Sequence, residues 1–457
     1  MKRNPFLNWL VAGMSAAMLL ALTLSFSLRP DAGPVEDVFK VMEIAAERNS
    51  QNLWPGFDIT HIPLLVCDSI DTWLFFMEEP LEGFMAAEGH PGVWYYKGQH
   101  PLVRGNSIIR SGNRWVATSL LSSVARRTGE RYRAADLAGI IIHEQFHVFQ
   151  RLNHPGWRQN DGVLLVYPPD DGRSLSLRRM EKDALRRAVI ADNEAEMCGW
   201  AMEALRYRKL RMEMLDDGFR QYERELQRTE GLSDYIERTA RNLDPLNASD
   251  ITSGIAPAGI RDMGYVEGRW IAMLLDRLSP AWKDDFELDG NLYLEDILEQ
   301  VINEKGFEAI RFTDSELDHF FRAAEDDLMK NMAKKTSESD QFRELNGYSL
   351  EIDALSRPLS VIIFEPLEFE ILDNGSLYHR LIFSAGNEAG SLRVMNQPCM
   401  TWFDRMLGVE RVVINGIKDM PEVIGEKKRI VLKNNNITID LGYTNLMIDD
   451  SLIRVEL

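Results

Sequence analysis

The spacing of hydrophobic and polar positions changes twice along the chain, and each change predicts a change of secondary structure. One amphipathic helix over residues 35–48 is followed, as far as about Leu121, by short apolar runs separated by Pro and Gly. The segment 106–121 predicts a hairpin that turns at Ser111-Gly112-Asn113. We therefore expect a small, mostly β subdomain over residues 35–125.

Helical spacing dominates the middle of the chain. Residues 134–152 carry apolar side chains on nearly every side, which is typical of a buried helix. A loop rich in Pro, Gly and Asp follows over 153–172, and helix signals resume over 177–242 and from Trp270 to about 335. These patterns predict a helical subdomain over residues 126–340.

From about Tyr348 the period becomes that of β-strands. The predicted strands are joined by turns such as Asn374-Gly375, a strong hairpin signal. Their ranges are 361–364, 369–372, 378–383, 411–414 and 430–432. Residues 345–457 are thus predicted to form an all-β C-terminal domain, for which we expect a role as a protein interface or as structural support. The predicted fold class is α+β.

The N-terminal 34 residues have the layout of an export signal or membrane anchor with a linker. Lys2 and Arg3 precede an uncharged run from Trp9 to Leu28, and acidic residues follow it. The run is long enough to cross a bilayer core, which needs about 20 residues. Because Ser25-Phe26-Ser27 is a poor cleavage site, we favour an uncleaved anchor over a removed signal peptide. The rest of the chain is then expected in the periplasm or at the outer face of the inner membrane.

Composition narrows the classes of function. The chain has 457 residues, enough for two or three domains, and a formal net charge of −19 without a Lys/Arg cluster. Nucleic-acid binding is not expected, because it needs a concentrated basic face. The three cysteines are Cys67, Cys198 and Cys399, too few and too scattered for a disulfide framework or a cysteine-rich zinc site.

The sequence His143-Glu144-Gln145-Phe146-His147 lies within the predicted buried helix. Histidines four positions apart share one helix face, so both imidazoles can reach one metal ion. Glu144 projects to the side, where it can take a proton from a water that zinc has made more acidic and pass it to a leaving amine. Three titratable side chains in a buried helix would be costly without such a purpose.

A catalytic zinc needs a third protein ligand. The metzincin pattern is excluded because Gln150 and Asn153 stand where it requires Gly and His; His154, one position later, is expected at the surface. Two carboxylates remain as candidates, Glu194 and Glu230. Glu194 lies in a charged helix whose acids usually face solvent, so we favour Glu230 and keep Glu194 as the alternative.

The segment from Thr229 to Glu237, TEGLSDYIE, resembles the ligand helix of the gluzincins, zinc peptidases with a His-Glu-x-x-His helix and a glutamate ligand. It is similar to Asn-Glu-Gly-Phe-Ala-x-Tyr of the membrane alanine aminopeptidases and to Asn-Glu-x-x-Ser-Asp of the thermolysin group. The resemblance implies a zincin-like core, Glu230 as third ligand of one Zn²⁺, and Asp234 as a carboxylate that orients a zinc histidine.

A third motif follows in the family's order. Gly264-Tyr265-Val266-Glu267-Gly268 resembles the aminopeptidases' Tyr-x-x-Gly, whose tyrosine stabilises the oxyanion, and the resemblance gives that role to Tyr265. The sequence also departs from the family's pattern in two ways. Glu230 follows His147 by 83 positions, whereas the spacing in those families is about 20, so the helical segment 177–225 is expected as an insertion. The family's Gly-x-Met-Glu-Asn stretch is missing.

The residues and the resemblance together predict a zinc-dependent peptidase acting on a peptide or protein, to which residues 106–109 could present an edge strand. A binding or assembly factor on the same scaffold is the first alternative. A zinc hydrolase of a non-peptide amide or ester is the second, and it would use the same residues.

Overall fold

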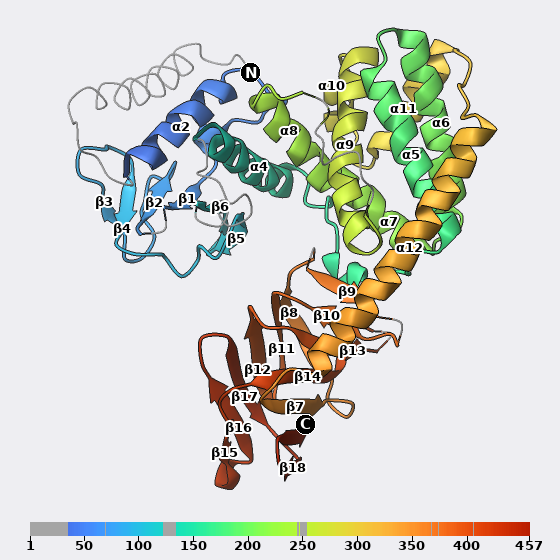
Figure 1. Cartoon of the computed structure of the whole chain (residues 1–457). Helices are drawn as coiled ribbons and strands as arrows, with labels where there is room; N and C mark the ends of the chain where they lie inside the picture. Colours follow the sequence, from blue (N-terminus) through green and yellow to red (C-terminus); the bar gives the residue numbers. More distant parts are fainter. Residues whose placement is uncertain are drawn as a thin grey trace. The chain divides into compact units, whose positions relative to one another are not determined.

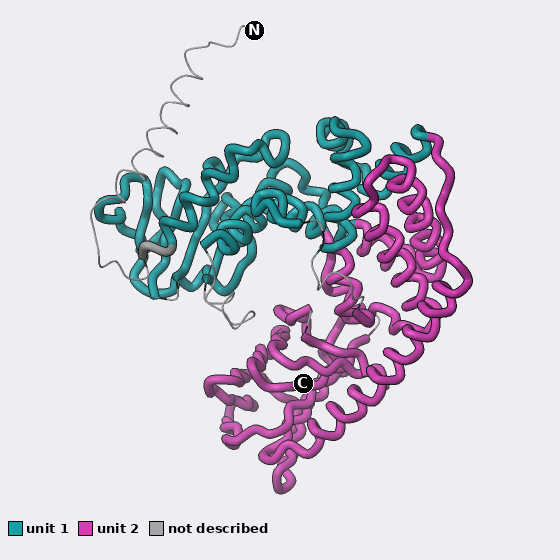
Figure 2. The backbone as a smooth tube through the Cα atoms, turned by 45° about the horizontal axis from the view of Figure 1, so that its top comes forward, with its two compact units in different colours: residues 1–158, 225–247, 265–305 teal, residues 159–224, 248–264, 306–457 magenta. Residues whose placement is uncertain are grey.

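The computed structural model describes residues 35–457 except 69, 122–133, 245, 247–253, 367, 373 and 405. The predicted export segment lies outside the described residues. Among those described, no helix is long and apolar enough to cross a membrane. The chain divides into two compact units, each built from separate stretches of sequence (Figure 2). Unit 1 comprises the described residues within 1–158, 225–247 and 265–305, and unit 2 comprises those within 159–224, 248–264 and 306–457.

Unit 1 begins with helix α2 (Val35–Asn49) and a six-stranded sheet (Figure 1). The strand order is β3-β4-β2-β1-β6-β5, in which β1 and β6 run parallel and the other pairs antiparallel. The strands are β1 (Leu64–Cys67), β2 (Thr72–Phe75), β3 (Met85–Ala86), β4 (Trp94–Tyr96), β5 (Ser107–Ser111) and β6 (Arg114–Leu120). Central β1 and β2 are wholly buried, whereas β5 forms one edge.

Helix α4 (Ala134–Asn153) contacts helices α2 and α8 and strands β5 and β6. Glu230 lies on a π-helical turn, Gln227–Gly231, which continues directly into α8 (Leu232–Ala240). The remaining helices are α9 (Ala258–Leu278), α10 (Trp282–Leu288) and α11 (Leu294–Lys305), and α7 (Asp217–Leu226) leads into the π turn. α7 and α9 each contribute residues to both units.

Unit 2 joins a helical layer to a β-sandwich. The helices are α5 (Gly172–Ile190), α6 (Glu194–Met212) and α12 (Asp314–Arg343), with a 3-10 helix over Asp161–Val166. Asp171 and Thr313 begin α5 and α12 with reciprocal capping boxes, which satisfy backbone donors at the helix starts. At its other end α12 holds the sandwich, where Arg380 binds Glu338 with donor–acceptor distances of 2.7 and 3.0 Å.

The sandwich consists of two sheets ordered β18-β19-β7-β14-β13-β10-β9 and β15-β16-β17-β12-β11-β8. Residues such as Leu350 and Ile414 from the first sheet and Phe383 and Ile439 from the second share one core, as expected for two layers packed face to face. The strands are β7 (Tyr348–Asp353), β8 (Ser360–Phe364), β9 (Phe369–Ile371), β10 (Leu377–His379), β11 (Ile382–Asn387), β12 (Gly390–Met395), β13 (Cys399–Phe403), β14 (Val409–Ile417), β15 (Glu422–Ile424), β16 (Arg429–Lys433), β17 (Ile437–Gly442), β18 (Asn445–Asp449) and β19 (Leu452–Glu456).

The mixed helix-and-sheet fold, with a helical region before a C-terminal all-β region, is confirmed. So are the helices at 35–48 and 134–152 and the hairpin turning at Gly112, which has a φ of 59°. The single strand predicted over 378–383 was wrong. It is two strands, β10 and β11, which belong to opposite sheets because the chain crosses between the layers at Arg380 and Leu381. The three cysteines are buried and form no disulfide with one another.

Candidate metal centre

Helix α4 is held in place by both its apolar and its polar side chains. Ile141, Ile142 and Phe146 are fully buried, and Phe146 packs edge-on against Trp54 and Phe57. Gln145, the central residue of the motif, donates to the carbonyls of Ile59 and Ile62 at 2.9 and 2.8 Å. The helix is thereby fixed to the segment that enters β1, and its opposite face is directed to α8.

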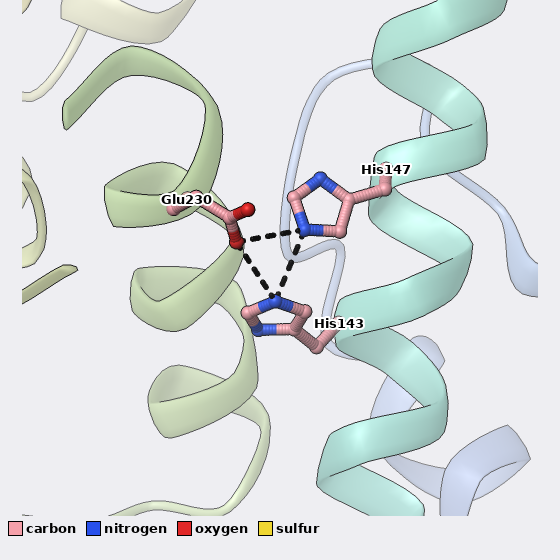
Figure 3. A group of neighbouring side chains, drawn as sticks. All are labelled: His143, His147 and Glu230. Atoms are coloured by element: carbon pink, nitrogen blue, oxygen red, sulfur yellow. Dashed lines mark hydrogen bonds and ion pairs between the residues drawn. The ribbon is translucent and has the colours of Figure 1, made fainter. Parts of the chain in front are cut away.

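His143, His147 and Glu230 converge on one point between α4 and the π turn (Figure 3). The Nε2 atoms of the two histidines lie 3.1 Å apart. Glu230 Oε2 lies 3.1 Å from Nε2 of His147 and 3.6 Å from Nε2 of His143. All three side chains are at most 15% exposed.

These distances fit a metal ion. Zinc with bonds of about 2.0–2.1 Å in tetrahedral geometry separates its ligand atoms by about 3.3 Å. The three measured separations, 3.1, 3.1 and 3.6 Å, bracket that value. Two imidazoles and one carboxylate are also a donor set that leaves a fourth tetrahedral position for water or substrate. The buried group His143, His147 and Glu230 could therefore hold a metal ion.

The π turn that carries Glu230 depends on close packing against α9. A Cβ atom at Gly268 would lie 2.4 Å from the carbonyl oxygen of Gln227 and 2.8 Å from the Cα of Gly231. Only glycine allows this approach. Gln227 adds a hydrogen bond of 2.9 Å to Glu267, the neighbour of Gly268. π turns are rare and often occur at functional sites, and this one carries Glu230 of the candidate metal group.

Glu237, on α8, supports His143 from behind. Its Oε2 lies 3.4 Å from Nδ1 of His143, the ring nitrogen that faces away from the centre. Glu237 also accepts from Arg241 at 2.8 Å, and Arg241 in turn pairs with Asp136 at 2.5 Å. A carboxylate behind a metal histidine fixes the tautomer and raises the ring's basicity.

Gly139 gives Glu237 and Arg241 room to reach this position. It lies one helical turn before His143 on α4, and a Cβ there would be 2.4 Å from Cδ of Arg241 and 3.1 Å from Cγ of Glu237. The lack of a side chain at Gly139 is therefore part of how His143 is positioned.

His147 is oriented by Gln150 and Ser233. Its Nδ1 lies 3.0 Å from Gln150 Oε1 and 3.2 Å from Ser233 Oγ. Gln150 also donates to the carbonyl of Thr229 at 3.0 Å, and Ser233 donates to the same carbonyl at 2.9 Å. Thr229 directly precedes Glu230, so the groups that orient one ligand also hold the turn that carries another.

The electrostatics of the centre follow from burial and from its carboxylates. Burial opposes the charged form of His143, but Glu230 and Glu237 outweigh it and hold the pKa of His143 well above its usual range. Burial raises the pKa of Glu144, and the two histidines oppose that rise. The histidines and carboxylates therefore titrate together: a change in the charge of one side chain shifts the pKa of its neighbours.

Tyr265 and Asp234 both lie close to the centre, in different surroundings. The ring of Tyr265 is nearly parallel to that of His143, at 12° and 6.2 Å between centroids. Asp234, the residue expected to orient a histidine, pairs with Arg269 of α9. Burial raises the pKa of Asp234 to about 6 against the effect of Arg269. It is Glu237 that lies against a ring nitrogen of His143.

The converging group does not include Glu194 or His154 among the described residues. Glu194 begins α6, in unit 2, whereas the three residues belong to unit 1. His154 is buried, so the expected surface position was wrong: its ring stacks on Trp157 at 3.8 Å, and Nε2 lies 3.0 Å from Glu287. The tight turn at the end of α4 brings this ring back against the helical core.

Comparison with protein-family models, with curated proteins and with solved structures finds no match to the chain.

Sequence reasoning missed Glu237, Gln150 and Ser233. A signal for Glu237 was present, because it follows Glu230 by seven positions, two turns of a helix, and so returns to nearly the same face. Gln150 similarly lies three positions after His147 on that helix.

Proposed function

We propose that the chain is a zinc-dependent peptidase of the gluzincin type. The observation that supports this most is the convergence of His143, His147 and Glu230, with ligand-atom separations of 3.1 to 3.6 Å, beside the carboxylate of Glu144. Their outer partners, Glu237 and Gln150, add support because metal histidines are commonly held in this way.

Zinc, when bound, would make a water more acidic and polarise the scissile carbonyl. Glu144 is the base that takes the proton from that water and later returns it to the leaving amine. It is 8% exposed and sits directly after His143 on α4, which favours this role. Tyr265 is the donor to the oxyanion, and its place beside the ring of His143 supports the assignment.

Strand β5 is the proposed docking strand for the substrate. Among the described strands it pairs with β6 alone, so its outer edge can accept an extended peptide by backbone hydrogen bonding. β5 also contacts α4, the helix that carries both histidines. The run from Trp9 to Leu28 is proposed to place this activity outside the cytoplasm.

The test compares the wild type with Glu144→Gln, both as full-length protein loaded with zinc, against a mixed peptide library analysed by mass spectrometry. The wild type is expected to cleave peptides and to lose this activity with a chelator. Glu144→Gln should lose at least about a hundredfold in rate, the contribution typical of a general base, while keeping its zinc. Activity retained in Glu144→Gln would contradict the assignment of the base.

A further inference from the structure

Arg151 lies one turn beyond His147 on α4, and no ion pair joins it to an acidic side chain among the described residues. The two positions are four apart, so their side chains are neighbours on the same helix face. Nη1 of Arg151 is enclosed and makes no hydrogen bond to any described residue. Three other arginines of unit 1 pair with carboxylates, in Arg228–Glu225, Arg241–Asp136 and Arg269–Asp234.

The guanidinium of Arg151 lies against the sheet, next to its edge. Its Cζ is 5.7 Å from the centre of the Trp115 ring, a cation–π distance. Trp115 is on β6 and pairs with Arg110 of the edge strand β5. Arg151 therefore lies on the helix that carries both histidines and contacts the strand next to β5, the edge along which an extended peptide would lie.

A second guanidinium, that of Arg158, adds positive charge near Arg151, beside which the described residues place no paired carboxylate. Burial and then the charge of Arg158 lower the pKa of Arg151. The chain has 71 acidic and 52 basic residues, so carboxylates are plentiful. Partly burying an arginine near a like charge is costly unless an anion completes the site.

We propose that Arg151 binds a carboxylate of the substrate and so determines specificity. The planar guanidinium suits bidentate recognition of a carboxylate, and the Trp115 ring fixes its plane. The carboxylate comes either from the free C-terminus of a peptide or from an Asp or Glu side chain. The identification of the ligand as a peptide rests on the proposed peptidase function.

The test measures binding apart from cleavage, by titration calorimetry on full-length, zinc-loaded Glu144→Gln. The probes are acetylated Ala/Leu pentapeptides in matched pairs: Glu against Gln at each position of an amidated peptide, and free acid against amide at the C-terminus. One acidic probe should bind about tenfold tighter than its neutral counterpart, as for a charge-assisted hydrogen bond. The pair that shows the preference identifies the source of the carboxylate.

Arg151→Gln, added to the Glu144→Gln protein, should abolish the preference for the acidic probe. Arg151→Lys should retain part of this preference, because lysine keeps the positive charge but lacks the planar guanidinium that donates two parallel hydrogen bonds. Arg104→Gln is the control: it removes an exposed arginine of the same unit and should leave the preference unchanged. Arg151→Lys also covers the case in which Arg151→Gln does not fold.

Equal binding of every acidic and neutral pair, or a preference that survives Arg151→Gln, would overturn the inference. The proposed function is tested separately, by incubating the wild type with the same peptides. If the preference depends on Arg151 and yet none of these peptides is cleaved, the carboxylate site stands and the peptidase activity does not.

Discussion

Two regions of this protein bury clusters of charged side chains, and they balance the charge in different ways. In unit 2 the helical ion cluster (Glu181, Arg208, Arg211 and Glu223) pairs carboxylates with guanidiniums. Arg211 donates to Glu181 at 2.7 Å and to Glu223 at 2.8 Å, and Arg208 donates to Glu181 at 3.0 Å. In unit 1 the candidate metal centre brings two imidazoles to one carboxylate.

The two clusters differ in whether the counter-charge is supplied by the protein itself. Burial alone would raise the pKa of Glu223, but Arg211 lowers it below the usual range, so the helical ion cluster carries its own counter-charges. At the metal centre the ligand atoms themselves converge at the spacing of a tetrahedral coordination shell. Such an arrangement could hold one further cation, whereas the helical ion cluster needs none.

The largest expected effect separates the two carboxylates proposed as third ligand. Glu230→Gln should weaken zinc binding about 300- to 8,000-fold, because one of three ligands supplies roughly a third of a binding free energy of about 10–16 kcal/mol. Competition with a chromogenic chelator measures the zinc affinity of the variant. Glu194→Gln should leave the affinity unchanged, and the reverse result would make Glu194 the ligand.

Breaking the helical ion cluster should damage stability and leave zinc binding intact. Glu223→Gln removes a buried partner of Arg211 and should cost about 3 kcal/mol in the free energy of unfolding. Urea denaturation followed by circular dichroism measures this cost, and metal analysis of the folded variant measures the zinc. Loss of zinc without loss of stability would show that the two clusters do not differ in the way described.

Gly268→Ala tests how the π turn positions Glu230. The new Cβ would lie 2.4 Å from the Gln227 carbonyl, so we expect a loss of about 2 kcal/mol in stability and about tenfold in zinc affinity. The control is Gly218→Ala, in α7, where nothing lies within 4 Å of the added atom. There alanine should stabilise by about 0.5–1 kcal/mol. Unchanged zinc affinity in Gly268→Ala would show that the turn does not depend on this contact.

The remaining prediction is a pH effect and concerns His379, a buried histidine of the sandwich bound to Thr401 at 2.9 Å. Burial lowers its pKa to about 3, the opposite direction from His143. Between pH 6.5 and 3 the unfolded chain therefore binds a proton that the folded chain does not. Stability should fall by about 1.4 kcal/mol per pH unit as the pH drops below 6.5.

His379→Gln should remove this part of the acid sensitivity, which thermal melts between pH 7 and 4.5 would measure. An unchanged slope would mean that other groups cause the acid sensitivity of the sandwich.

Secondary-structure elements and motifs that depend on residues close together in the sequence could be predicted from the sequence alone. Helix α4 follows from its apolar positions, and the β5–β6 hairpin from the turn at Gly112. Glu230 was selected by the motif around it, and the structure places its carboxylate with both histidines.

Contacts between segments far apart in the sequence could not be predicted from the sequence. Glu237 supports His143 because Gly139, on another helix, leaves space for it, and no local pattern couples the two positions. The π turn requires Gly268 of α9 against Gln227, a contact between separate segments. Likewise, only two residues separate β10 from β11 in sequence, and the choice of partner strands divides them between two sheets.

The metal content of the full-length protein tests the central claim most directly. After dialysis against zinc and removal of excess metal, elemental analysis should find about one zinc per chain in the wild type and in Glu144→Gln, and almost none in the double variant His143→Ala/His147→Ala. A wild-type content near zero would contradict the account, because His143, His147 and Glu230 would then converge without binding the ion that their geometry fits.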